Sequence, residues 1–262
     1  MPYLRIAGID VYEEVAGAGD PLLLLHGGFC SLESLREQGE ALAAARRVYA
    51  FERPGHGRSA DEAGEYSYER GLEQVLAYLD AHDLPSVDVV GYSDGAILGL
   101  LLAMRHPERV RSLVAISANL DPSAFTRSHE AAGALVLQPL GDPAHATDAA
   151  EQEPDVERLH YDRLSPDGPE HADVVLAKLF RLWTSEPHID PADLRGITAR
   201  TLVMSGDRDT IRPDHSILIA ASIPGAQLAI VPGATHGLLA ERPALISAII
   251  GDFLGAPAAS AR

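Results

Sequence analysis

The stretch Val87-Asp88-Val89-Val90-Gly91-Tyr92-Ser93-Asp94-Gly95-Ala96 decides the fold of this 262-residue chain. It joins an apolar run, typical of a buried strand, to the pattern Gly-x-Ser-x-Gly, after which apolar residues recur at helical spacing. A serine at such a sharp turn has a strained backbone, and glycines at both flanking positions let neighbouring chain segments approach closely. The stretch therefore predicts a strand, a tight turn and a helix that present the Ser93 hydroxyl at the edge of a sheet.

Strands and helices alternate on both sides of this turn. The run Pro21 to His26 is apolar without polar alternation, which is typical of a central strand buried on both faces. Before it, Tyr3 to Ile6 and Ile9 to Val15 are predicted to form a hairpin around Gly8. Further predicted strands are Val48 to Phe51, Val87 to Gly91, Val110 to Ile116, Thr201 to Ser205 and Leu228 to Val231. The predicted helices are Ser31 to Ala45, Tyr68 to His82, Asp94 to His106, Asp214 to Ala221 and Pro243 to Leu254. This alternation predicts an α/β fold with a mostly parallel sheet of about eight strands, right-handed crossovers and helices on both faces.

One long segment interrupts the alternation. Residues 121–195 are rich in Asp, Glu, Pro and His, and they contain helix-like patches such as Val174 to Trp183 but no strand-like run. We interpret this segment as a helical cap inserted into a core made of residues 1–120 and 196–262.

Composition and charge exclude several classes of protein. With 46% hydrophobic and 23% charged residues, the chain is neither disordered nor a small disulfide scaffold. Its formal charge of −17 repels phosphate backbones and anionic lipids, so neither nucleic acid nor a membrane is an expected partner. No apolar run reaches the roughly 20 residues of a membrane helix. There is no leader-like segment, so the expected location is the cytoplasm.

The single cysteine, Cys30, cannot form an internal disulfide. Without a neighbouring base in the sequence, it is interpreted as a small packing residue rather than a reactive thiol. The histidines lack the spacing of a metal site, and the glycines lack the pattern of a dinucleotide-binding loop. We therefore expect no metal and no cofactor.

The serine at the sharp turn needs chemical partners if it is to act as a nucleophile. A serine hydroxyl is weak at neutral pH unless a base accepts its proton and a carboxylate orients that base. Asp207 and Asp209 follow the predicted strand Thr201 to Ser205, and His236 follows the next strand. The chain contains eleven histidines, so a surface loop histidine is the alternative for His236, but its place after the last strand favours the base. The residues alone leave both aspartates open.

By these motifs the chain resembles the α/β-hydrolase superfamily, in its short-cap esterase, lactonase and C–C hydrolase branch, over nearly its whole length. Besides Gly-x-Ser-x-Gly, four further motifs match. His26-Gly27-Gly28 resembles the family's oxyanion loop, and Glu52-Arg53-Pro54-Gly55-His56-Gly57-Arg58-Ser59 resembles its Asp-x-Arg-Gly-x-Gly-x-Ser turn. Gly206-x-x-Asp209-x-x-x-Pro213 resembles its acid turn, and His236 with Glu241-Arg242-Pro243 resembles its histidine loop. The chain departs from the family at Glu52, where the usual residue is aspartate.

The resemblance implies a catalytic triad of Ser93, His236 and Asp209 rather than Asp207. It also implies that the backbone N–H groups of Asp94 and Gly28 hold the oxyanion that forms during acyl transfer. Phe29 is the near alternative to Gly28 as the second donor, and a simple turn that ends the strand is the alternative for the whole His-Gly-Gly motif.

Three residues are candidate substrate contacts: Phe29, Asp94 and Trp183. The Asp94 carboxylate could attract a cationic substrate group and raise the pKa of His236. Alternatively, an aspartate in the first turn of a helix simply points at backbone donors there. Cap residues that could line a pocket, with cap packing as the alternative for each, are Phe125, Arg127, His129, His160, Tyr161, His171, Arg181 and Trp183.

These features predict a cofactor-independent serine hydrolase that cleaves a carboxylic ester or lactone of a small molecule through an acyl-enzyme. Hydrolysis of a C–C bond in a diketone by the same triad is an alternative, and so is a ligand receptor that keeps an intact triad. The chemistry that this superfamily performs with an aspartate nucleophile is disfavoured, because the turn carries Ser93. The sequence gives no indication of the oligomeric state.

Overall fold

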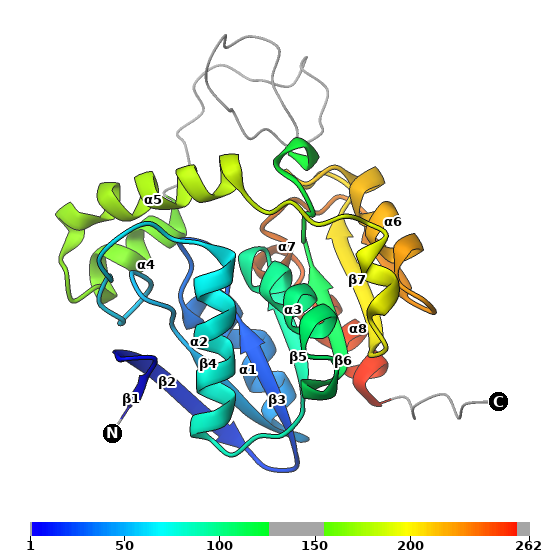
Figure 1. The fold of residues 1–262 in the computed structure, drawn as a ribbon, viewed down its shortest axis with the longest axis horizontal. Helices are drawn as coiled ribbons and strands as arrows, with labels where there is room; N and C mark the ends of the chain where they lie inside the picture. The colour runs from blue at the N-terminus through cyan, green and yellow to red at the C-terminus, as the bar shows by residue number, and fades with distance from the viewer. Residues whose placement is uncertain (1, 126–154, 256–262) are drawn as a thin grey trace, which may run out of the picture.

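The computed structural model describes residues 2–125 and 155–255, and an eight-stranded sheet forms its centre (Figure 1). The strands are β1 (Tyr3–Ile6), β2 (Ile9–Gly17), β3 (Asp20–Leu25), β4 (Arg46–Phe51), β5 (Val87–Tyr92), β6 (Val110–Ile116), β7 (Arg200–Gly206) and β8 (Gln227–Val231). Their order is β1-β2-β4-β3-β5-β6-β7-β8, in which β2 runs antiparallel to β1 and β4 and all other neighbours are parallel. The predicted mostly parallel sheet of about eight strands is therefore confirmed.

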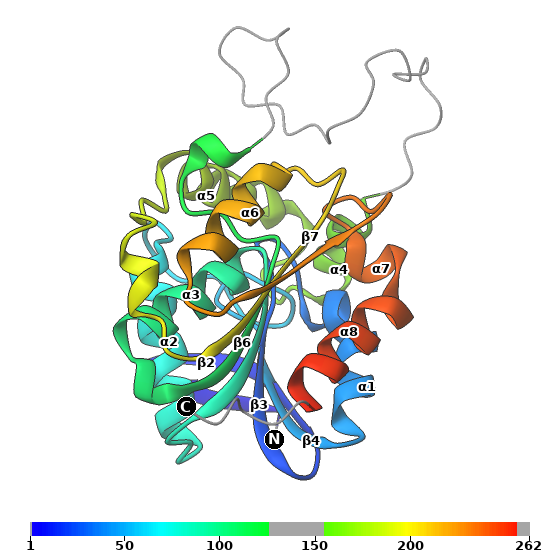
Figure 2. The ribbon, with the colours of Figure 1, turned by 90° about the vertical axis from the view of Figure 1, so that its right-hand side faces the viewer.

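Helices cover both faces of this sheet. They are α1 (Arg36–Ala43), α2 (Tyr68–Ala81), α3 (Asp94–Arg105), α4 (Val156–Leu164), α5 (Ala172–Ser185), α6 (Pro213–Ser222), α7 (Leu238–Glu241) and α8 (Pro243–Gly255). Figure 2 shows α2, α3 and α6 on one face and α1 and α8 on the other. The helix predicted from Ser31 starts as a 3-10 turn at Leu32–Leu35, with the Ser31 hydroxyl accepting a hydrogen bond from the Glu33 amide. Side-chain capping by serine is a common way to begin a helix.

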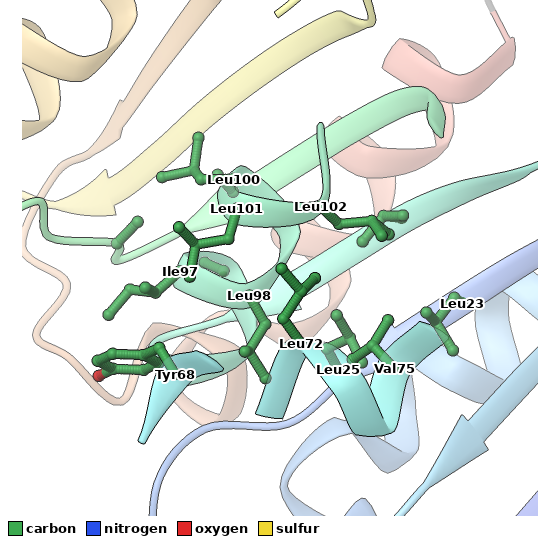
Figure 3. Packing of buried hydrophobic residues seen from close by; sticks show 14 of the residues in the cluster. Leu23, Leu25, Tyr68, Leu72, Val75, Ile97, Leu98, Leu100, Leu101 and Leu102 are labelled. Carbon is green, nitrogen blue, oxygen red and sulfur yellow. The ribbon is translucent and has the colours of Figure 1, made fainter. Parts of the chain in front are cut away.

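The central strand β3 has apolar side chains on both faces. Leu23 and Leu25 pack into the cluster under α2 and α3 (Figure 3), whereas Leu22 and Leu24 pack into the cluster under α1 and α8. Successive strand residues point to opposite faces, so a strand covered on both sides loses its polar alternation. Each fully buried leucine contributes about 1.5 to 3 kcal/mol to folding relative to exposure. This double burial explains the continuous leucine run in the sequence.

Helices α4 and α5 lie beyond the carboxyl ends of the strands (Figure 1). Helix α5 is anchored by Lys178, the single lysine of the chain. Its Nζ donates hydrogen bonds to Asp61 Oδ2 and to the Glu62 carbonyl, both at 2.7 Å, and its side chain is almost fully buried. The segment that follows β4 thereby holds one side of the predicted cap. Residues 126–154 lie outside the described part of the chain, so the cap boundaries 121 and 195 stay a prediction.

No helix within the described ranges combines the length and the apolar character needed to cross a membrane.

The turn from β5 to α3 depends on close backbone contacts. Ser93 has φ 53° and ψ −118°, outside the helical and extended regions. A Cβ atom on Gly91 would lie 2.3 Å from the Gly95 carbonyl oxygen, and one on Gly95 would lie 2.1 Å from the Leu25 carbonyl oxygen. No other residue type fits at either position without moving backbone, as the sequence pattern predicted.

Replacing Gly95 with alanine should therefore destabilise the protein. We expect the free energy of unfolding to fall by about 2 to 3 kcal/mol, since the added methyl group must displace β3 or α3. Gly251→Ala in helix α8 is the matched control, because nothing lies within 4 Å of its added Cβ. It should raise the free energy of unfolding by about 0.5 to 1 kcal/mol. Urea denaturation of both variants measures the difference, and similar values for the two would contradict the role of the close contact.

Candidate active site

Three polar side chains meet where parallel strands end. Ser93 follows β5, Asp209 lies in the turn after β7, and His236 follows β8. The Ser93 Oγ is 3.1 Å from His236 Nε2, and His236 Nδ1 is 2.6 Å from Asp209 Oδ1. The structure thus brings together the three residues that the sequence nominated. This chain of hydrogen bonds is the arrangement in which a histidine can take a proton from a serine hydroxyl.

Asp209 is fully buried and firmly held. Its Oδ1 accepts a hydrogen bond from the Ile211 amide at 3.0 Å, and its Oδ2 accepts one from Ser117 Oγ at 2.5 Å. Burial acts to raise the pKa of Asp209, but the nearby His236 and these hydrogen bonds outweigh it, so the pKa lies below its ordinary value. The carboxylate therefore stays ionised beside the imidazole.

Ser117 was not identified from the sequence. It comes directly after β6, whose carboxyl end lies between those of β5 and β7, and its φ is 55°. The rule that located the other site residues, polar groups at the carboxyl ends of parallel strands, applies to Ser117 as well. A serine is so common in turns that this signal alone did not distinguish it.

The two aspartates of the acid turn have different surroundings. Asp207 is exposed and accepts a hydrogen bond from the Gly233 amide at 2.7 Å. It therefore links the turn after β7 to the loop after β8, whereas Asp209 contacts the imidazole. The three-dimensional course of the turn thus separates two residues that the residue types alone left open.

The imidazole of His236 is partly exposed, with 29% of its side chain accessible. Burial acts to lower the pKa of His236, but the charge and hydrogen bond of Asp209, with a smaller effect of the Asp94 charge, raise it above the ordinary histidine value. Tyr92 also contacts His236. Its hydroxyl donates to the His236 carbonyl at 2.7 Å, and the two ring centroids are 5.3 Å apart.

Backbone amides around Ser93 are available for hydrogen bonding. Among the described residues, the N–H groups of Gly28, Phe29 and Asp94 have no hydrogen-bond acceptor. Asp94 is the first residue of α3, where N–H groups lack an intrahelical partner and the helix dipole favours negative charge. Phe29 has a φ of 57°, which is unusual for an aromatic residue and marks a constrained loop.

His26 and Arg53 brace the loop that carries Gly28. The Arg53 amide donates to His26 Nε2 at 2.9 Å, so the ring proton is on Nδ1, which donates to the Gly27 carbonyl at 2.7 Å. Burial lowers the pKa of His26 well below its ordinary value, so this imidazole is neutral. The Arg53 Nη2 also donates to the Gly27 carbonyl at 3.1 Å. These contacts fix the backbone of the loop beside Ser93.

Glu52, which stands where the family pattern has aspartate, is fully buried and has a structural role. Its carboxylate accepts hydrogen bonds from the Leu32 amide at 3.0 Å and from Arg58 Nη1 at 2.8 Å. A Cβ on Gly57 would lie 2.2 Å from the Glu52 Cδ atom. The longer side chain is thus accommodated against a glycine. It holds the turn together and lies outside the chain of hydrogen bonds around Ser93.

The side chain of Asp94 has partners that the sequence did not suggest. Its Oδ1 accepts hydrogen bonds from the Tyr68 hydroxyl and from Trp183 Nε1, each at 2.9 Å, and its Oδ2 is 3.6 Å from Arg53 Nη2. The expectation that it points at backbone donors of its own helix is therefore wrong. Its hydrogen bonds instead connect α3, which carries Asp94, to Tyr68 of α2 and Trp183 of α5. Its role as a substrate contact stays a prediction.

The other candidate substrate residues lie in different surroundings. Phe29 is buried and its ring stacks on Tyr161 of α4, with centroids 5.2 Å apart. Trp183 is half-buried and packs against Phe125 and Ile211. Cys30 is buried, and burial raises the pKa of its thiol well above the ordinary value, as expected of a packing residue.

Three other cap candidates make ion pairs, and one of them, His160, pairs with Glu157 and also lines a pocket beside Tyr92 and Gly237. His171 binds Asp61, and Arg181 binds Glu65 at the surface. Arg127 and His129 lie outside the described residues. Within the described ranges, no group of three or more His, Cys, Asp or Glu side chains is arranged to hold a metal ion.

Comparison with known proteins identifies similar chains. A sequence model of the Alpha/beta hydrolase family matches residues 22–249. The chain is 29% identical to the putative carbamate hydrolase RutD of Azorhizobium caulinodans, over 97% of this chain and 98% of the relative. It is 30% identical to a 2-hydroxymuconate semialdehyde hydrolase of Pseudomonas putida, over 91% of this chain and 88% of the relative.

Solved structures give the same picture of the fold. A hydrolase from Pseudomonas aeruginosa superposes with a TM-score of 0.76 at 27% identity, covering 97% of this chain and 98% of the other. The enol-lactonase from Burkholderia xenovorans LB400 superposes with a TM-score of 0.77 at 22% identity, covering 97% of this chain and 100% of the other. At this level of identity, the likeness to the lactonase is one of fold.

The contrast between the two aspartates of the acid turn gives a test of the site geometry. Asp209→Asn should lower the pKa of His236, because the negative charge that favours the imidazolium is lost. Asp207→Asn, two residues away, should leave that pKa unchanged. Titration of the His236 ring protons by NMR measures both. A shift of equal size in the two variants would show that the turn has a different course in solution.

Proposed function

Because this chain belongs to the alpha/beta hydrolase family and is thus a hydrolase, we propose that it is a serine hydrolase cleaving a carboxylic ester or lactone of a small molecule. The single observation that carries the proposal is the continuous hydrogen-bonded chain from Ser93 Oγ through His236 to Asp209, with separations of 3.1 Å and 2.6 Å. A hydroxyl, a base and an orienting carboxylate in this order are what nucleophilic acyl transfer requires.

In the first half of the proposed reaction, Ser93 Oγ attacks the substrate carbonyl carbon. His236 Nε2 takes the serine proton, while Asp209 holds the proton on Nδ1 and stabilises the imidazolium. The carbonyl oxygen becomes an oxyanion that accepts hydrogen bonds from the amides of Asp94 and Gly28. Each such donor contributes about 3 to 4 kcal/mol to the stability of the transition state. His236 then protonates the leaving alcohol, and an ester forms between Ser93 and the acyl group.

The second half repeats these steps with water. His236 Nε2 takes a proton from water, whose oxygen attacks the acyl carbon, and the same amides hold the second oxyanion. Collapse of this intermediate breaks the bond to Ser93 Oγ, which recovers its proton from His236 and releases the carboxylic acid. Proton transfer and one covalent bond to serine complete the cycle, so the proposed chemistry requires neither a metal nor a redox cofactor.

A second candidate is hydrolysis of a C–C bond in a diketone on the same residues. The 30% identity to a 2-hydroxymuconate semialdehyde hydrolase over most of both chains supports this candidate. Fold and triad alone do not distinguish ester from C–C cleavage, because the superfamily places different chemistries on one framework. Turnover of a simple ester against turnover of a vinylogous diketone separates the two.

The ester hydrolase proposal is tested with p-nitrophenyl acetate. The wild-type protein should release many equivalents of p-nitrophenol, and Ser93→Ala should reduce kcat by at least about 10³-fold, since the nucleophile is lost. Ser222→Ala is the control and should keep full activity, because the hydroxyl that it removes donates to the Leu218 carbonyl of its own helix α6. A folded wild-type protein that cleaves the diketone but no ester would favour the second candidate. Release of a single equivalent would favour a ligand receptor.

The charge of Asp94 gives a prediction for the pH profile. His236 acts as a base only when neutral, so kcat/KM falls as the pH drops through its raised pKa. Asp94→Asn removes a negative charge that favours the imidazolium, so the pKa falls and the acidic limb moves to lower pH. The asparagine oxygen can still accept from Tyr68 and Trp183, which preserves the packing. Profiles of kcat/KM with p-nitrophenyl acetate measure the shift, and an unmoved limb would show that the charge does not reach His236.

A further inference from the structure

The indole of Trp183 lies directly against the loop that would hold the oxyanion. A Cβ atom built on Gly28 would lie 2.5 Å from Trp183 Cζ2 and 3.0 Å from Cε2. It would also lie 2.6 Å from Asp94 Oδ2. The six-membered ring of the indole therefore covers Gly28, and only glycine leaves room for it. The two residues assigned to the oxyanion are both in contact with this one side chain of α5.

The position of the indole is fixed from several directions. Its Nε1 donates to Asp94 Oδ1 at 2.9 Å, and the same oxygen accepts from the Tyr68 hydroxyl at 2.9 Å. Asp94 is 2% exposed and Tyr68 is 3% exposed, so neither partner is free to move into solvent. Away from Gly28, Trp183 packs on the buried pair Phe125 and Ile211. A side chain held by a buried carboxylate and by apolar packing forms a rigid wall.

Trp183 and the neighbours of His236 pack against different apolar clusters of the core. The residues Ala234 and Leu238 beside His236 belong to the apolar cluster on the α1 and α8 side. Trp183 packs against the cluster on the α2 and α3 side, which includes Tyr68 (Figure 3). In ester cleavage the leaving oxygen must face His236 Nε2, because it receives its proton there. The acyl chain then points away from His236, and the indole that covers Gly28 bounds the space beside the oxyanion loop.

We propose that Trp183 forms the end wall of the acyl subsite and restricts the protein to esters of short acyl groups, of the size of acetate to butyrate. This inference rests on the proposed function. An acyl chain of six or more carbons would have to displace an indole that is hydrogen-bonded to a buried carboxylate. The indole thus sets the substrate class by steric exclusion, and its packing on Phe125 and Ile211 together with the hydrogen bond to Asp94 holds it in place.

The test compares p-nitrophenyl acetate, butyrate and octanoate, which share one leaving group and differ only in the acyl chain. For the wild-type protein, we expect kcat/KM to be at least tenfold lower for octanoate than for acetate. Trp183→Ala should raise the octanoate to acetate ratio at least tenfold. Trp183→Phe keeps an aromatic wall without the N–H group, so its ratio should stay much closer to that of the wild type.

Two controls separate the wall from general effects on the cap. Phe180→Ala removes an aromatic residue from the exposed face of the same helix, so its chain-length ratio should match that of the wild type. Acetate esters of small and large alcohols should keep their relative rates in Trp183→Ala, because the alcohol lies on the His236 side. Circular dichroism checks folding, and Trp183→Leu, which shortens the wall but stays apolar, replaces the alanine variant if that variant does not fold.

The possible results distinguish a wrong assignment of the acyl subsite from a wrong assignment of the reaction. A folded Trp183→Ala or Trp183→Leu variant whose chain-length ratio equals that of the wild type overturns the assignment of the wall, while the serine hydrolase proposal stands. A wild-type protein that already prefers octanoate also overturns it. If the folded wild-type protein cleaves neither an ester nor a lactone, the proposed function fails, and the acyl subsite fails with it.

Discussion

The close approach of backbone at the turn between β5 and α3 is the constraint on which the rest of the structure depends. The left-handed φ of 53° at Ser93 costs about 1 to 3 kcal/mol, and it persists only because surrounding packing overdetermines it. That packing comes from α3, where ten of twelve residues are buried between the sheet and α2. Gly91 and Gly95 let the turn touch its own helix and the end of β3. Strain at one serine is thus maintained by the apolar core of the whole domain.

A second requirement is the burial of charge close to this turn. Asp209 and Asp94 are both almost fully buried, and a buried carboxylate is tolerated only with hydrogen bonds or an opposite charge. Asp209 receives donors from Ser117, Ile211 and His236, and these contacts fix the imidazole in one orientation. Asp94 receives donors from Tyr68 and Trp183 and lies close to Arg53. One carboxylate therefore orients the histidine, while the other connects the nucleophile helix to the cap.

Much of this protein was predictable from local pattern. The glycine-flanked serine, the apolar strand runs and the helical spacing gave the eight strands and the helices that cover them to within a few residues. The position of Ser93 and His236 after strands, and the resemblance of the Asp209 segment to the family's acid turn, nominated three residues that the fold brings within hydrogen-bonding distance. Such features follow from the sequence because each depends on near neighbours: periodicity selects the element, and the carboxyl end of a parallel strand selects the edge of the sheet.

The contacts that the sequence did not reveal join residues far apart in the chain. The Ser117 bond to Asp209 and the Trp183 bond to Asp94 span 92 and 89 positions, and no local pattern encodes them. For the Asp94 carboxylate the sequence offered a substrate group or backbone donors of its own helix as partners, but tertiary packing supplied a tyrosine of α2 and a tryptophan of α5. The sequence by itself determined the order of strands and helices along the chain and nominated the residues for chemistry. Only the tertiary structure decided which groups surround them, because side-chain hydrogen bonds depend on distance in space rather than on position in the chain.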